Sequence, residues 1–133
     1  MKYTYMLDTN TCIFLMKNIE TVREKYYSYK DKGICLSSIT VAELQFGVYN
    51  SQRIEYNIRN LNNFLLGFEV LDFSYSVTAE YGKIKSDLRK KGILISDNDM
   101  LIAAHAKALN LILVTNNTKE FCRIEKLLIE DWK

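Results

Sequence analysis

The stretch S-D-N-D-M-L-I-A-A-H-A, residues 96–106, places acidic residues at the start of an otherwise apolar helix. Ser96 and Asp99 stand three residues apart, the spacing of a helix N-cap and its first turn. At about 100° per residue, Asp99 shares a face with Ala103 and Ala106, the side expected to pack on a sheet. A buried carboxylate is costly unless it is hydrogen-bonded, paired with a cation or protonated. Asp99 therefore either caps its own helix or belongs to a functional site.

The composition is that of one soluble domain. Of the 133 residues, 48% are hydrophobic and 26% are charged, which is enough to build a single core. The net charge of +2 is too small to indicate nucleic-acid binding, so any basic surface must be local. The three cysteines are widely spaced and fit neither a disulfide framework nor a zinc site. Because no signal-peptide or membrane-length apolar run occurs, we expect one reduced, cytoplasmic domain over residues 1–133 with no membrane partner.

Short apolar runs alternate with helical patterns along the chain. Helical spacing predicts helices in the segments between these runs, and a serine or threonine stands at the start of several of these helices. We expect Ser74 or Ser76 to cap the helix that ends near Lys91, and Thr118 to cap the last helix. Strands that alternate with helices imply right-handed crossovers and a mostly parallel sheet. We therefore expect an α/β fold with about five strands and helices on both faces. The predicted strands lie at residues 3–7, 34–36, 68–73, 111–114 and 127–129.

Polar side chains follow several of the predicted strands. Asp8 ends the first strand, Glu43 lies in the helix after the second, and Asn117 follows the strand at residues 111–114. In open parallel sheets ligands gather at the carboxyl ends of the strands, so these residues and Asp99 are expected to share one rim. Each also has a plainer interpretation, because Asp and Asn favour turns and Glu is a good helix former.

Three carboxylates at one rim repel one another unless a proton or a cation intervenes. Oxygen ligands of this kind suit Mg²⁺ or Mn²⁺, which can orient a phosphodiester and activate water for its hydrolysis. The only histidine, His105, lies in mid-helix with no nucleophile to serve, so we interpret it as structural. Asp97 lies roughly 160° around the helix from Asp99 and is predicted to be a solvated acid of the first turn.

Five motifs follow one another along the chain: L-D-T-N at residues 7–10, A-E-L at 42–44, N-D-M-L-I-A-A-H-A at 98–106, V-T-N-N-T-K-E-F at 114–121 and E-D-W at 130–132. In this order they resemble the motifs of PIN-domain ribonucleases of the VapC toxin type. The resemblance covers nearly the whole chain and implies a PIN-like α/β fold, with Asp8, Glu43 and Asp99 as an acidic, catalytic site for Mg²⁺ or Mn²⁺.

The resemblance also implies roles for neighbouring side chains. Asn117 stands where many family members carry a fourth acid, and Glu120 is a candidate substitute for that acid. Thr9 and Thr115 match hydroxyls that lie beside the family's acids, where they are expected to orient the ligands. Asp97 is an additional acid that either tunes metal affinity or has no role.

By the same resemblance, the chain is expected to cleave structured RNA such as tRNA. It is also expected to form a homodimer and to be neutralised by a VapB-type antitoxin. The densest positive segment is a candidate RNA-binding helix. Its plainer interpretation is a solvated helix end whose charge suits the helix dipole. This segment contains Lys83, Lys85, Arg89, Lys90 and Lys91.

Three other classes of protein remain open on the sequence. A receiver-like phosphoacceptor would use Asp72 as acceptor and Asp8 to hold Mg²⁺, but such proteins carry an acidic pair after the first strand. The run D-T-N-T at residues 8–11 partly resembles the D-x-D-x-T pattern of aspartyl-nucleophile phosphatases, with Asn10 replacing the second acid. A catalytically silent RNA-binding module would share the fold and the basic helix, and would bind RNA without cleaving it.

Overall fold

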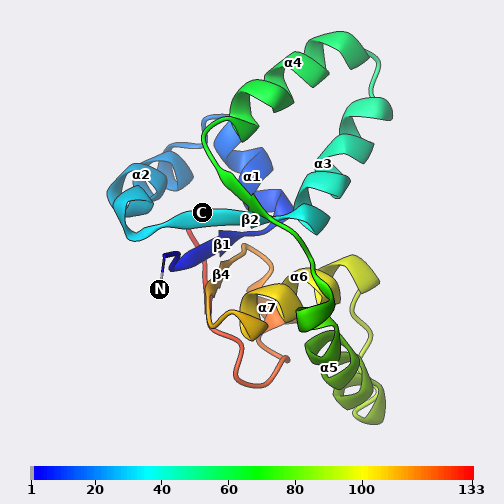
Figure 1. Cartoon of the computed structure of the whole chain (residues 1–133). Coiled ribbons are helices and arrows are strands. Elements are labelled where there is room, and N and C mark those ends of the chain that lie inside the picture. Colours follow the sequence, from blue (N-terminus) through cyan, green and yellow to red (C-terminus); the bar gives the residue numbers. More distant parts are fainter. Residues whose placement is uncertain (1) are drawn as a thin grey trace.

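A five-stranded parallel sheet forms the centre of the molecule (Figure 1). The computed structural model describes residues 2–133, and every strand pairing in it is parallel. The strand order β3-β2-β1-β4-β5 places the first strand in the middle. This confirms the predicted α/β class, and the expected last strand lies slightly later than predicted. The strands are β1 (Tyr5–Leu7), β2 (Ile34–Ser37), β3 (Glu69–Leu71), β4 (Ile112–Val114) and β5 (Ile129–Glu130).

Helices cover both faces of the sheet, as the alternation of elements predicts. In Figure 1, α1 to α4 lie above the sheet, and α5, α6 and α7 lie below it. No helix within residues 2–133 is long and apolar enough to cross a membrane. The helices are α1 (Thr9–Met16), α2 (Glu20–Tyr29), α3 (Ser38–Tyr49), α4 (Ile54–Leu65), α5 (Thr78–Lys90), α6 (Asp97–Ala108) and α7 (Thr118–Phe121), with 3-10 turns η1 (Lys30–Lys32) and η2 (Tyr75–Val77).

The sheet separates two hydrophobic cores because successive side chains of a strand point to opposite faces. Met6 joins the core under α5 and α6, whereas Tyr5 and Leu7 join the core under α1, α2 and α3. Trp132, only 2% exposed, closes the second core with its ring 5.4 Å from that of Tyr5. Side chains on both faces of β1 are therefore buried from water, and Asp8 follows directly after this buried strand.

The junction of η1 and β2 sets the register of the central strands. Gly33 has φ +90°, and a Cβ there would stand 2.2 Å from the backbone oxygen of Lys2. Its carbonyl accepts from the backbone N–H groups of Thr4 (2.9 Å) and Tyr5 (3.1 Å), which aligns β1 beside β2. Only glycine combines this backbone conformation with so close an approach.

Two predicted helix caps are wrong. Neither Ser74 nor Ser76 caps α5, because η2 intervenes and the two serine hydroxyls hydrogen-bond each other at 2.7 Å. Thr118 is the first residue of α7, and Asn117 stands at the cap position without a side-chain cap bond. The elements themselves are where the sequence predicts them.

Candidate active site

Asp8 is fixed at the carboxyl end of β1. Its backbone N–H donates to the carbonyl of Val114 (3.0 Å), and its carboxylate caps α1 by accepting from the Thr11 N–H (2.8 Å). The residue is 5% exposed. Burial raises the pKa of Asp8, while the Thr115 hydroxyl and the Thr11 N–H and hydroxyl act against that rise. Asp8 is thus a buried acid whose pKa is raised, although several hydrogen-bond donors surround its carboxylate.

Glu43 lies half-buried on α3 and connects two other helices. One of its oxygens accepts from the Thr9 hydroxyl on α1 (2.5 Å), and the other accepts from the Asn98 amide on α6 (3.3 Å). Its charge raises the pKa values of both Asp8 and Asp99. Glu43 is therefore joined to the residues that neighbour Asp8 and Asp99 in the sequence, Thr9 and Asn98.

Asp99 and Glu120 form the second half of the rim. Burial, followed by the adjacent Glu120 carboxyl, raises the pKa of Asp99 to about 7, and the Ser96 hydroxyl opposes this rise. While Asp99 is ionised, no group within residues 2–133 donates to the buried Glu120 Oε1. Two facing carboxylates without a donor require a shared proton or a cation.

The polar residues after β4 play different parts. Thr115 is fully buried beside Asp8, and its hydroxyl accepts from the Asn117 N–H at 3.0 Å. Asn117 is exposed, and its side chain makes no hydrogen bond to the acids within residues 2–133. Glu120, one turn further along, is the fourth carboxyl group that lies against the predicted site.

Asp97 faces away from the acids, as its position on the helix predicts. It accepts from Lys85 Nζ (3.0 Å) and from the Tyr81 hydroxyl (2.9 Å), both on α5. These hydrogen bonds lower its pKa. Asp97 therefore joins the first turn of α6 to α5 and lies outside the group of facing carboxylates.

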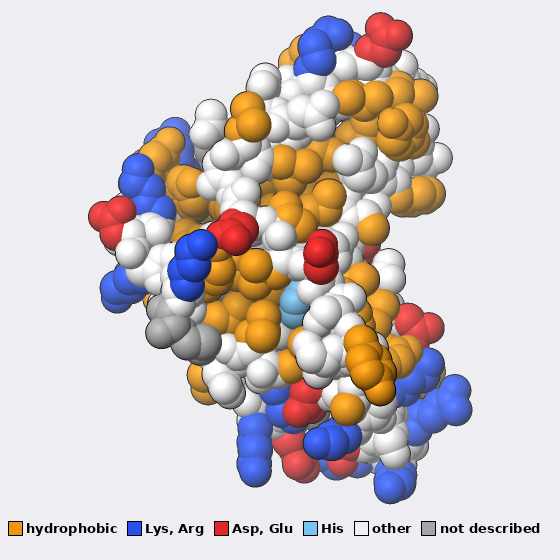
Figure 2. Space-filling view, viewed as in Figure 1, with side chains coloured by type: hydrophobic (Ala, Val, Ile, Leu, Met, Phe, Trp, Pro, Cys, Tyr) orange, Lys and Arg blue, Asp and Glu red, His pale blue; other side chains and the backbone are white. Residues whose placement is uncertain are grey.

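The basic segment of α5 lies on the surface near the lower end of the molecule, where positive and negative side chains alternate (Figure 2). Lys85 is paired with Asp97, and Lys91 is paired with Asp87 and Glu125 at 2.9 Å each. These contacts fit the plainer interpretation of a solvated charged helix for part of the segment. The other three residues, Lys83, Arg89 and Lys90, form no ion pair with residues 2–133.

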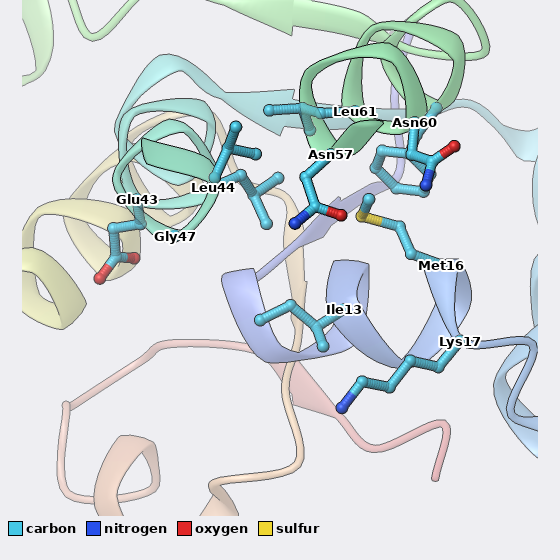
Figure 3. Close-up of a pocket in the computed structure, with 11 residues that line it drawn as sticks. Ile13, Met16, Lys17, Glu43, Leu44, Gly47, Asn57, Asn60 and Leu61 are labelled. Carbon is cyan, nitrogen blue, oxygen red and sulfur yellow. The ribbon is translucent and has the colours of Figure 1, made fainter. Parts of the chain in front are cut away.

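A groove of about 690 Å³ opens beside the rim, between α1, α3 and α4. Its wall is mostly apolar, with Glu43 and Lys17 on different parts of its margin (Figure 3). Sequence analysis missed this groove, because the separation of its three helices is a tertiary property that no local pattern encodes. The lining residues labelled in the figure are Ile13, Met16, Lys17, Glu43, Leu44, Gly47, Asn57, Asn60 and Leu61.

The donor chemistry of the rim fits a hard divalent cation. Its polar atoms are carboxylate oxygens, and one of them, Glu120 Oε1, is buried with no hydrogen-bond partner in the described part of the chain. The acids stand as neighbouring pairs, and no three His, Cys, Asp or Glu side chains within residues 2–133 converge as a preformed cluster. Mg²⁺ usually keeps several waters and needs only one or two carboxylates, so this open arrangement suits it.

The strand order excludes the receiver-like alternative. In the flavodoxin-like order β2-β1-β3-β4-β5, β3 lies next to β1, which would bring Asp72 close to Asp8. Here β3 is an edge strand and β2 stands between it and β1. The phosphatase-like pattern also lacks its second acid, because Asn10 is an exposed amide in the first turn of α1.

Comparison with known proteins places this geometry in a family. The model of the PIN domain matches residues 5–127. Ribonuclease VapC2 of Rickettsia felis is 45% identical, covering 96% of this chain and 97% of that protein. The tRNA(fMet)-specific endonuclease VapC of Salmonella typhimurium is 41% identical with the same coverage.

Solved structures agree with the sequence comparison. VapBC2 from Rickettsia felis, bound to a promoter DNA fragment, has a TM-score of 0.94 at 42% identity and covers 98% of this chain and 99% of that one. DNA-bound VapBC from Salmonella typhimurium has a TM-score of 0.93 at 40% identity, with coverage of 98% and 99%. With the domain match, the relatives and the shared architecture in agreement, this chain belongs to the PIN domain family.

Proposed function

We propose that this chain is a metal-dependent endoribonuclease toxin of the VapC type that acts in the cytoplasm on structured RNA such as tRNA. The observation that carries the proposal is the set of neighbouring acids Asp8, Glu43 and Asp99 at the rim, with a buried Glu120 oxygen beside Asp99 that has no hydrogen-bond partner within residues 2–133. Relatives at 41–45% identity are named ribonucleases or a tRNA(fMet)-specific endonuclease.

In this proposal Asp8, Glu43, Asp99 and Glu120 hold Mg²⁺ or Mn²⁺. When bound, such an ion supplies an activated water and polarises the scissile phosphodiester. Thr9 and Thr115 orient the ligands, because their hydroxyls lie against Glu43 and Asp8.

The acids also control when a cation can bind. Asp99 has a pKa of about 7, so it must release a proton before its carboxylate can serve as a ligand. The negative rim by itself repels an RNA phosphate, and this repulsion is removed only when a cation neutralises the carboxylates.

The proposed neutralising partner is a VapB-type antitoxin. The solved relatives named above are VapBC complexes, and the apolar groove of this chain ends at Glu43. We place an antitoxin helix in that groove, because an amphipathic helix uses such grooves and would cover Glu43 when seated. The homodimer implied by the family resemblance stays a prediction that sedimentation of the purified chain can test.

Substitutions at two glycines test the groove. Gly47 lines it, and a Cβ there would meet nothing within 4 Å, so Gly47→Leu should fill the groove without disturbing α3. We expect antitoxin binding to weaken at least about tenfold, since a buried contact worth about 1.4 kcal/mol is lost. Gly82→Leu on α5, equally free of contacts, is the matched control and should leave binding unchanged. Equal weakening by both variants, or by neither, would place the antitoxin elsewhere.

Cleavage of total bacterial RNA by the purified chain tests the proposed activity. We expect discrete fragments with Mg²⁺ or Mn²⁺, and none with EDTA or with Asp8→Asn, Glu43→Gln or Asp99→Asn. Asp97→Asn is the matched control, because Asp97 lies two residues from Asp99 but faces α5, and it should cleave normally. If two of the three rim variants kept the wild-type rate, the metal-site assignment would be wrong. RNA binding without any cleavage would instead favour the silent binding module.

A further inference from the structure

A buried hydrogen bond joins the two helices that carry Glu43 and Asp99. His105 Nδ1 on α6 lies 2.8 Å from the Ser37 hydroxyl, which is the N-cap of α3. Both residues are at most 1% exposed, so water does not replace this contact. A buried polar pair of this kind costs free energy when either partner is removed.

The Ser37 hydroxyl takes part in two hydrogen bonds. Its oxygen accepts from the Ile39 N–H at 3.1 Å, and it shares a second hydrogen bond with His105 Nδ1, whose direction depends on the imidazole tautomer. The edge-on ring of Phe73, 5.4 Å away, fixes the plane of the imidazole. Burial lowers the pKa of His105 while the charge of Asp72 raises it, and burial is the larger effect. The ring is therefore neutral, and its Nδ1 can share one hydrogen bond with Ser37 in either tautomer.

A second hydrogen bond joins the same helices at the rim. Asn98 donates to Glu43, and the two contacts pair the helices in opposite chain directions. Ser37 precedes Glu43 by six residues, and Asn98 precedes His105 by seven. At about 1.5 Å per residue, the contacts are separated by about 9 to 10 Å along each helix. The contact between His105 and Ser37 is buried, whereas the contact between Asn98 and Glu43 is exposed and includes a proposed metal ligand.

We propose that His105 is a positioning residue for the metal site: through Ser37 it fixes α3 against α6 and so sets the spacing of Glu43 and Asp99. This inference rests on the proposed function, because the spacing matters only if both acids hold one cation. His105 itself touches neither the RNA nor the ion. It acts on the ligands through the helices that carry them. Residues that orient metal ligands without touching the metal commonly change the affinity of a site for its metal.

Substitutions of His105 and Ser37 test the proposal. His105→Leu fills the site but removes the hydrogen-bonding nitrogen, whereas His105→Asn keeps an amide that can donate or accept near the position of Nδ1. We expect His105→Leu to weaken Mn²⁺ binding to the whole chain about tenfold, measured by calorimetry, and His105→Asn to restore most of that loss. The Mn²⁺ concentration for half-maximal cleavage should rise in parallel, with RNA affinity unchanged. Ser37→Ala, which leaves the imidazole in place, should match His105→Leu and serves if that variant does not fold.

The proposal is overturned if His105→Leu and Ser37→Ala bind Mn²⁺ as tightly as wild type at a temperature where both are folded. Lower melting temperatures with unchanged Mn²⁺ affinity would show that the pair is only structural. The variant Asp99→Asn distinguishes a failure of the His105 proposal from a failure of the proposed function. If wild type binds Mn²⁺ and Asp99→Asn does not, the metal site stands whatever His105 does. If wild type neither binds Mn²⁺ nor cleaves RNA, both proposals are wrong.

Discussion

At the scale of single residues, Asp99 determines how the site responds to pH. Its pKa rises from an ordinary 3.8 to about 7 because burial and the Glu120 carboxyl both disfavour the charged form. A group whose folded pKa is raised stabilises the fold fully below its unfolded pKa, and this stability is lost as the pH rises through the folded value. In metal-free protein, the contribution of Asp99 therefore falls between about pH 4 and about pH 7.

Removing this charge should stabilise the metal-free chain at alkaline pH. We expect Asp99→Asn to raise the free energy of unfolding by on the order of 1 kcal/mol at about pH 8, and to change it little at about pH 4. Urea unfolding at the two pH values measures the difference. Asp97→Asn should show no such gain, because the Asp97 carboxylate is exposed and its pKa is lowered by Lys85. A wild-type chain as stable as Asp99→Asn at the higher pH would contradict the assigned pKa.

Thr40 offers a second test at this scale. It is fully buried on α3, and its hydroxyl has no hydrogen-bond partner within residues 2–133. Thr40→Val replaces that hydroxyl with a methyl group of similar size, so we expect a gain of about 1 kcal/mol in the free energy of unfolding. Thermal unfolding monitored by circular dichroism measures it. A loss of stability would mean that the hydroxyl has a partner, such as a buried water.

Part of the site was predictable residue by residue. Asp8 and Glu43 follow strands, and Asp99 opens a helix. Because parallel strand ends meet at one edge, local pattern was enough to predict that these acids lie near one another. The solvated position of Asp97 followed from helical geometry and is confirmed by its pairing with Lys85. The approach of Glu120 to Asp99 depends on how α7 folds back after β4, which no local pattern encodes.

At the scale of elements, the turn from η1 into β2 is the most constrained junction. Gly33→Ala places a Cβ against the Lys2 carbonyl in a backbone conformation that alanine disfavours, so we expect a loss of about 2 to 4 kcal/mol in stability. Gly82→Ala within α5 is the control, and should be neutral or stabilise by up to about 1 kcal/mol. Chemical denaturation of both variants provides the comparison, and similar stabilities would show that the junction relaxes without cost.

Element type was more predictable than element ends. Alternating apolar runs and helical spacing were sufficient to identify the five strands and the helices between them, because burial on both sheet faces imposes those patterns. The start of α5 was not predictable in this way. A serine cap and a 3-10 turn compete for the same residues, and Ser74 and Ser76 bond each other instead of the helix.

At the scale of the whole molecule, a net charge of +2 leaves RNA binding to local surfaces. Of the basic residues on α5, those without ion pairs should contribute most, because they need not first give up an acidic partner. We expect substitution of Lys83, Arg89 and Lys90 by Gln to weaken RNA binding and to reduce the salt slope of log K by about 0.7 to 0.9 per contact. Filter binding across a salt series measures the slope. Lys25→Gln on α2 is the control, and an unchanged slope in the triple variant would remove α5 from the RNA path.

The central position of β1 has a consequence for the time during translation at which the proposed site can form. A nascent chain that has emerged from the ribosome only as far as α5 already contains Asp8 and Glu43, but it lacks Asp99 and the β4 neighbour of β1. Glu120 follows later, and Trp132, which covers Tyr5, later still. Cleavage that requires all of these groups cannot begin during most of translation. The order in which the fold is completed therefore delays the proposed activity until nearly the whole chain has been synthesised.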